Sequence, residues 1–248
     1  MAFNFGEMKS GNPTLRKAFQ RPGVVVDSSV MTVTGAINKS GILLVLLALG
    51  GVYGWDLAGS ESFGLGVMGS MLVGFILAMV ISFKPNLAPA LAPLYALAEG
   101  VAIGAISAIF EARSPGIAFN AMCLTFSTLG LMLALYHFKV IRYSARLQKV
   151  IFIATGAVAV TYLINMVMSM FGHQMAFLHD SSMLGIGISC LIVVIAAFNL
   201  ILDFEIVIQG VENRAPKYME WYAGFALLVT LVWLYLEILK LLSRLSKK

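Results

Sequence analysis

Three carboxylates lie well inside apolar segments of this sequence and are its main candidates for chemistry. Glu99, Asp203 and Glu237 each have aliphatic and small neighbours on both sides. An ionised carboxylate in hydrocarbon is costly, so each should face the interior of a helix bundle, pair with another group or take up a proton. Such a group can bind a cation when ionised and change its contacts when protonated. We therefore expect a site that handles ions or protons.

The neighbours of these carboxylates leave a second interpretation open for each. Asn199 precedes Asp203 by one helical turn on the same face, which predicts a polar pair in the bundle interior. In the alternative interpretation, Asp203 is a carboxylate at the end of a helix, where water at the membrane surface solvates it. Glu237 is followed one turn later by Lys240, which offers a local ion pair instead. Glu99 has small neighbours, and its alternative is a protonated carboxyl group hydrogen-bonded across helices.

The sequence lacks the signatures of several other chemistries. It contains no G-x-S-x-G elbow, no H-E-x-x-H pair and no glycine-rich phosphate loop, so we expect neither an enzyme nor a cofactor. Cys123 and Cys190 lie in apolar runs and read as packing residues, without the Cys/His spacing of a metal site. His137, His173 and His179 are expected near the membrane surface, where the last two could modulate a response to pH.

The composition predicts that the carboxylates lie in a membrane. Hydrophobic residues make up 60% of the 248 residues, and charged residues only 12%, against about 25% in ordinary soluble domains. The net charge of +5 indicates contact with anionic lipid rather than nucleic acid, because no basic stripe alternates with aromatic residues. Residues 1–40 are polar, lack the features of a secretory signal and are predicted to form a cytoplasmic tail.

Seven apolar runs are long enough, or nearly so, to cross about 30 Å of hydrocarbon. We expect transmembrane helices near residues 41–55, 63–83, 91–110, 116–138, 150–171, 183–208 and 221–242, which form one domain over residues 41–248. Short connections with Pro or Gly make sequential helices antiparallel neighbours. Small residues recur at every fourth position in two runs, which favours close helix packing. These residues are Gly66, Ser70, Gly74 and Ala78 in the second run, and Ala96, Gly100, Gly104 and Ala108 in the third.

Basic residues predict the orientation, because cytoplasmic segments of membrane proteins are rich in Lys and Arg. With the N-terminus in the cytoplasm, twelve basic residues fall on the inner side and only Arg113 falls in an outer loop before the C-terminal tail. Seven crossings place the basic C-terminal tail outside, against this rule. We nevertheless expect seven crossings, in the cytoplasmic (inner) membrane of the cell.

Three segments resemble the Bax inhibitor (transmembrane BAX-inhibitor-motif) family, in particular a bacterial branch of it. Residues 97–104 (LAEGVAIG) are similar to the family's third-helix motif, and residues 202–204 (LDF) to its sixth-helix aspartate motif. Residues 234–242 (LYLEILKLL) are similar to the motif of its last helix, with Glu237 in place of an aspartate. Between the last two motifs this sequence is longer than is usual for the family.

The resemblance implies a fold and an activity. The fold is all-α, with two three-helix layers around a central C-terminal helix. The activity is a pH-sensitive calcium leak, in which Asp203 and Glu237 would sense protons, gate the pore and hold calcium transiently. We hypothesise that the two carboxylates share a proton or a hydrogen bond. Lys84 and Arg142 lie on the expected side for the family's basic latch, and Glu99 and Asn199 are candidates for polar groups of the interior.

Two other functions fit the same residues. A proton-coupled transporter of a small solute would use the carboxylates in a saturable, solute-dependent exchange. A non-conducting membrane protein that modulates a protease or another partner would show no flux. The expected partners are calcium ions, protons and the lipid bilayer.

Overall fold

The chain folds into a bundle of seven long helices. The computed structural model describes residues 30–60, 63–173, 175 and 182–246, which contain helices and no strand. The helices are α2 (Val33–Leu57), α3 (Phe63–Phe83), α4 (Ala88–Arg113), α5 (Ile117–His137), α6 (Ala145–Met170), α7 (Met183–Glu212) and α8 (Met219–Leu245). All seven are long and apolar enough to cross a membrane, as predicted.

The predicted start of the first helix is wrong. α2 begins at Val33, where Thr32 caps the helix by accepting a hydrogen bond from the Gly35 amide. The polar residues at positions 38–40 interrupt the apolar run, so hydropathy alone did not predict the first turns of α2. Polar residues continue a helix readily outside hydrocarbon. The predicted tail of residues 1–40 is therefore too long at its C-terminal end, and its residues 1–29 lie outside the described part of the chain.

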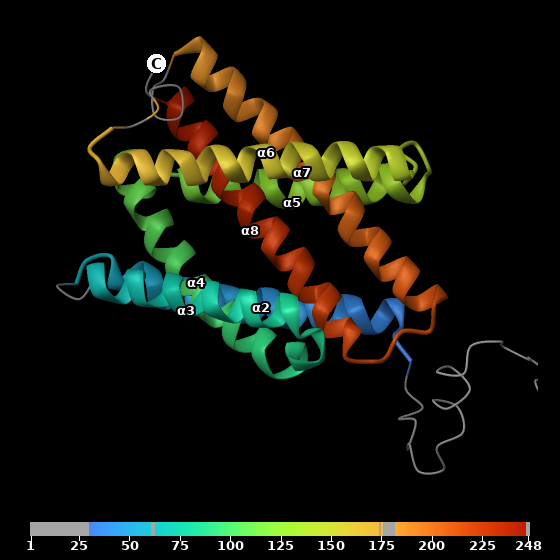
Figure 1. Cartoon of the computed structure of the whole chain (residues 1–248). Helices are drawn as coiled ribbons and strands as arrows, with labels where there is room; N and C mark the ends of the chain where they lie inside the picture. Colours follow the sequence, from blue (N-terminus) through green and yellow to red (C-terminus); the bar gives the residue numbers. More distant parts are fainter. Residues whose placement is uncertain (1–29, 61–62, 174, 176–181, 247–248) are drawn as a thin grey trace, which may run out of the picture.

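The helices form two layers with α8 between them (Figure 1). In one layer α4 packs on α2 and α3, and in the other α7 packs on α5 and α6. α8 contacts α2, α4, α5 and α7, so it touches both layers. Two three-helix layers around a central last helix confirm the predicted architecture.

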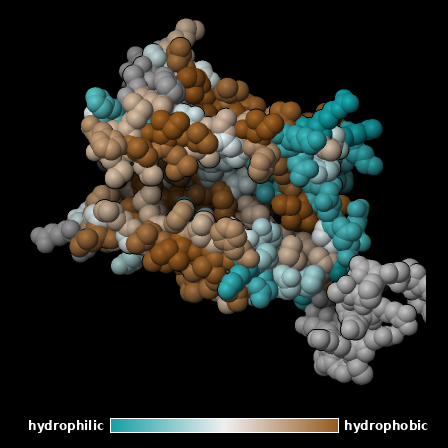
Figure 2. All heavy atoms as spheres, viewed as in Figure 1, coloured by the Kyte–Doolittle hydropathy of each residue, from teal (hydrophilic) through white to brown (hydrophobic). Residues whose placement is uncertain are grey.

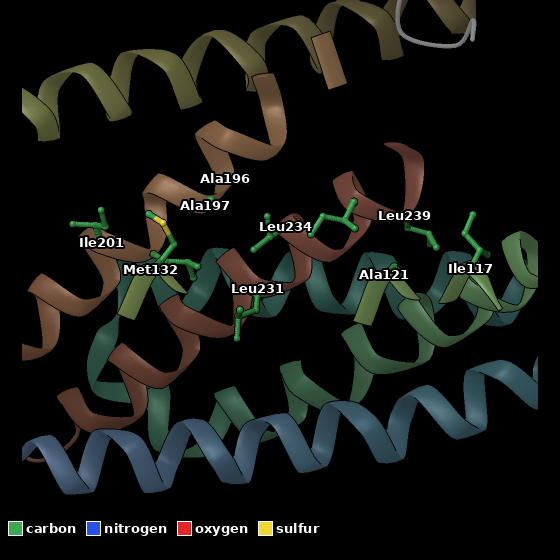
Figure 3. Packing of buried hydrophobic residues seen from close by; sticks show 11 residues of the cluster. Ile117, Ala121, Met132, Ala196, Ala197, Ile201, Leu231, Leu234 and Leu239 are labelled. Carbon is green, nitrogen blue, oxygen red and sulfur yellow. The ribbon is translucent and has the colours of Figure 1, made fainter. Parts of the chain in front are cut away.

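The core between α8 and the second layer consists of aliphatic side chains. Leu231, Leu234 and Leu239 of α8 are all less than 5% exposed. Figure 3 shows them among residues of α5 and α7: Ile117, Ala121, Met132, Ala196, Ala197 and Ile201. Burial of these side chains fixes α8 against α5 and α7, and so sets which polar residues of α8 face each neighbour.

Small residues bring α2 and α4 into backbone contact. A Cβ atom at Gly104 would lie 1.9 Å from the carbonyl oxygen of Gly51, and one at Gly100 would lie 2.2 Å from that of Leu47. On α2, Gly50 and Gly54 approach α4 equally closely. The predicted seam of the third run therefore has a packing role, with α2 as its partner.

α8 runs from one end of the bundle to the other. At its start, Glu220 accepts hydrogen bonds from Thr32, the residue before α2. At its end, the Ser246 hydroxyl lies 3.2 Å from that of Ser114 in the α4–α5 turn. Seven helices therefore traverse the bundle, and the last one ends opposite the start of α2.

The surface matches a bilayer environment. Large apolar side chains face outward along most helices, for example Leu65 and Phe152, which are 84% and 76% exposed. In Figure 2 hydrophobic residues cover most of the visible face, which is hollowed between the layers, while hydrophilic residues gather at one end. The chain is a multi-pass membrane protein.

Candidate functional site

Asp203 is a buried carboxylate on α7, turned toward α8. Its side chain is 8% exposed, so it is not the solvated helix-end group of the alternative interpretation. The Thr230 side chain of α8 is a polar neighbour of this carboxylate. Oδ2 of Asp203 has no hydrogen-bond partner among the described residues. A buried acceptor without a partner is costly, so this oxygen is a site where a proton or a cation would be stabilised.

Glu237 is more completely buried, at 1% exposure, and it has partners. The Tyr162 hydroxyl of α6 donates to its Oε1 at 2.8 Å and lies 2.9 Å from Oε2. Lys240 donates to Oε1 at 3.0 Å, and its ammonium lies 4.7 Å from the centre of the Tyr162 ring. The predicted alternative, a local pair with Lys240, is thus present together with a second partner. The cluster joins α6 to α8, whose backbones have no extensive contact with each other.

The hypothesis that Asp203 and Glu237 share a proton or a hydrogen bond is wrong for this structure. Asp203 lies beside Thr230, which is two helical turns before Glu237, or about 10 Å along the axis of α8. Both side chains belong to the described residues, and no hydrogen bond joins the two carboxylates. The cause is register, because the turn after Glu212 sets which residue of α8 lies opposite Asp203.

The other predicted interior groups lie in separate places. Asn199 donates to the Thr155 hydroxyl at 2.8 Å and so links α7 to α6. Glu99 is half-buried against α3, where a Cβ at Gly74 would lie 2.9 Å from its Oε2. No hydrogen bond of the kind expected across helices joins Glu99 to a described residue. The two groups therefore line different helix interfaces.

Neither predicted latch residue contacts the carboxylates. Lys84 precedes a short 3₁₀ turn (Pro85–Leu87), and Arg142 lies between α5 and α6; both are exposed. Within the described residues neither forms an ion pair with Asp203 or Glu237. The assignment of Lys84 or Arg142 as a latch therefore receives no support from the geometry.

A resident metal site would need more ligands than these carboxylates supply. The described residues contain no group of three or more His, Cys, Asp or Glu side chains that could hold a metal ion. Calcium takes six to eight oxygen ligands. A calcium ion at Asp203 would therefore draw most of its ligands from water and carbonyl groups, which suits transient binding and not storage.

Several polar residues at the helix interfaces were missed because their role depends on tertiary contacts. Glu220 is 1% exposed and accepts from both the amide and the hydroxyl of Thr32 at 3.0 Å. Tyr136 of α5 donates to Glu205 of α7 at 2.7 Å. The Arg244 guanidinium donates to the Gly185 carbonyl of α7 at 2.6 Å. A long polar side chain in an apolar helix was the available signal for each.

The fold and these buried carboxylates define a polytopic helical membrane protein with ionisable groups in its interior. A family model described as Bax inhibitor 1 like matches residues 5–247. The chain therefore belongs to the Bax inhibitor 1-like family, as the three motifs predicted. No curated protein matches it, and no solved structure matches it either.

The Tyr162–Glu237 contact gives a first prediction. Tyr162→Phe removes the hydroxyl that serves the buried carboxylate, so we expect unfolding to become easier by about 2 kcal/mol, the usual value for a hydrogen bond to a charged group. Thermal unfolding of the detergent-purified protein measures the change. Tyr143→Phe is the control, because it removes a hydroxyl that donates to the exposed Gln148 in the first turn of α6. Equal melting temperatures for the two variants would show that the Glu237 cluster does not stabilise the bundle.

Proposed function

We propose that this protein is a pH-sensitive cation leak that passes calcium, and that Asp203 is its ion- and proton-responsive group. One observation carries the proposal: a carboxylate oxygen of Asp203 is buried between α7 and the central helix and has no partner in the described residues. A charge in that position is unfavourable until a cation or a proton neutralises it.

The position of Asp203 supports a link between its charge and the shape of the bundle. α8 contacts four helices from both layers, so a shift of α8 alters both layers together. Ionised Asp203 carries a desolvation cost because it is buried, and a proton or a transient cation relieves that cost. We propose that this exchange shifts a closed–open equilibrium. Glu237 is assigned a different role, as the fixed point that Tyr162 and Lys240 hold.

We also propose the inner membrane of the cell as its location, with the start of α2 in the cytoplasm. Pro216 of the α7–α8 loop pairs with Val30 just before α2, so these segments share one end. Arg214 and Lys217 belong to this loop, and Lys39 to the first turns of α2. Clustered basic residues favour the cytoplasmic side.

Calcium flux into sealed liposomes tests the proposal, measured from acid to neutral pH. We expect a pH-dependent flux, and Asp203→Asn should change it on the order of tenfold and flatten its pH profile, since about 1.4 kcal/mol in the closed–open balance has that effect. Glu205→Gln is the matched control on the same helix. Its carboxylate already accepts from Tyr136 and Gln209, so its pH profile should follow that of the wild type.

The outcomes separate the competing functions. A wild-type pH profile in Asp203→Asn would remove Asp203 from the mechanism. Flux that saturates and requires a solute on the opposite side would identify a proton-coupled transporter. Absence of flux above empty liposomes at every pH would reject the leak and favour a membrane modulator of another protein.

A further inference from the structure

A cavity of about 610 Å³ lies between the two layers. α2 and α5 form its sides, and α4 and α8 form its floor. It occupies the half of the bundle nearer the α4–α5 turn, and its volume is in the range of sites that bind small molecules. Neither Asp203 nor Glu237 lines it, so the cavity is separate from the site proposed for the leak.

The cavity opens sideways, between α2 and α5. α2 packs on α4 and α8, and α5 packs on α7 and α8, but α2 and α5 have no extensive backbone contact with each other. Val52 of α2 and Phe119 of α5 line the cavity and are 66% and 65% exposed. Because these helices cross a membrane, an opening between them at this depth faces the acyl chains of lipids.

Away from the Trp55–Asp56 end, the polar side chains in the cavity wall already have partners within the protein. The hydroxyl groups of Ser107 and Tyr235 lie 2.6 Å apart in a hydrogen bond. Thr125 donates to a carbonyl of its own helix, and the Glu111 carboxylate accepts from amides at the start of α5. A bound water needs two to four polar partners, and an apolar cavity without them stays dry. The middle of the cavity therefore suits an apolar occupant.

The end of the cavity at the C-terminus of α2 has a different character. Trp55, 42% exposed, and the exposed Asp56 line it there. Tryptophan is enriched where hydrocarbon meets the polar headgroups. Asp56 and Glu111 make this end acidic, which favours a cationic group over an anionic one.

We infer that this cavity holds one acyl chain of a bilayer phospholipid, with an amine-bearing headgroup at the Trp55–Asp56 end. The chain would enter between α2 and α5 and lie against α8 and α4. The site would make a lipid part of the packing between the layers, at the place where α2 and α5 lie apart.

Photochemical labelling in bilayers tests the inference. The full chain is reconstituted with a phosphatidylethanolamine that carries a diazirine in the middle of one acyl chain, and the labelled residues are mapped by mass spectrometry. Any bilayer lipid reaches the outward-facing Leu65 and Phe75. We expect additional label on Ile103 and on Leu231, which is 4% exposed in the cavity floor. Label confined to outward-facing residues would overturn the inference.

A variant that fills the cavity sharpens the test. Ala48 lines the cavity and is exposed, so Ala48→Trp places an indole there. Label on Leu231 relative to Leu65 should fall on the order of tenfold, because the apolar contact that holds the chain is lost. Val45→Trp is the matched control, since Val45 is on the same helix, 61% exposed and outside the cavity. Undiminished label on Leu231 in Ala48→Trp would contradict a bound chain.

Two further arms complete the experiment. If Ala48→Trp does not elute as the wild type in size-exclusion chromatography, Met122→Trp fills the same cavity from α5. Phosphatidylglycerol with the same photoreactive chain should label Leu231 less than phosphatidylethanolamine does. Equal labelling by the two lipids would overturn the assignment of an amine headgroup.

Discussion

Gly104→Ala is expected to force α2 away from α4 and to destabilise the bundle by about 3 kcal/mol, at the upper end for an overpacked interface. The added Cβ would lie 1.9 Å from the carbonyl oxygen of Gly51 and 2.7 Å from its Cα. These are backbone atoms of a helix, which cannot rotate away as a flexible side chain can. Relief therefore requires the two helices to separate along their contact.

Gly130→Ala provides the control for this prediction. It makes the same change in the middle of α5, where a Cβ meets nothing within 4 Å. Alanine is a better helix former than glycine, so Gly130→Ala should stabilise the protein by about 0.5–1 kcal/mol. Thermal unfolding in one detergent compares the two variants with the wild type. A Gly104→Ala protein that melts at or above the wild-type temperature would contradict close packing of α2 on α4.

The helices and their order were predictable because hydrophobic length alone identifies a membrane span. The boundaries of the helices were less predictable, as α2 shows. Its first turns carry Lys39 and lie beside the polar end of the bundle, where the composition of a helix no longer differs from that of a tail. The spacing of Gly100 and Gly104 predicted a close helix contact. Its partner was not predictable, because Gly50 and Gly54 belong to a separate run and only the fold brings them together.

The individual residues of the candidate site were predictable, but their arrangement in space was not. Asp203 and Glu237 were identified because a carboxylate in an apolar run is costly, and both are buried. Their separation was not foreseen, since it depends on how the α7–α8 turn sets the register of two antiparallel helices. Tyr162 reaches Glu237 from α6, far away in sequence, and no local pattern predicts such a contact.

The same limit applies to Glu220, whose local sequence suggests a surface residue. Its carboxylate instead accepts the amide and the hydroxyl of Thr32, at 3.0 Å each, and lies directly against Gly35. A carboxylate at the N-terminus of a helix also interacts favourably with the helix dipole. Glu220 thus ties the start of α8 to the start of α2, one element of the first layer.

Glu220→Ala is expected to lower the free energy of unfolding by about 3 kcal/mol, since two hydrogen bonds to a buried charge are lost together. Glu212→Ala should have little effect, because Glu212 is exposed at the end of α7. Thermal unfolding of the purified variants measures both changes. If the Glu220→Ala and Glu212→Ala proteins melted at the same temperature, the contact between Glu220 and Thr32 would not hold α8 to α2.

A double-mutant cycle separates the free energy of the Thr32–Glu220 contact from the general cost of the space that Glu220→Ala leaves empty. Thr32→Val removes the hydroxyl, which both donates to Glu220 and caps α2, so it should cost about 2 kcal/mol in the wild type. In the Glu220→Ala background the hydroxyl has lost its acceptor on α8, and the same change should cost only the cap, about 1 kcal/mol. Additive effects would mean that Thr32 acts only as the cap of α2. A clear coupling would identify Glu220 as the residue through which a movement of the central helix reaches α2.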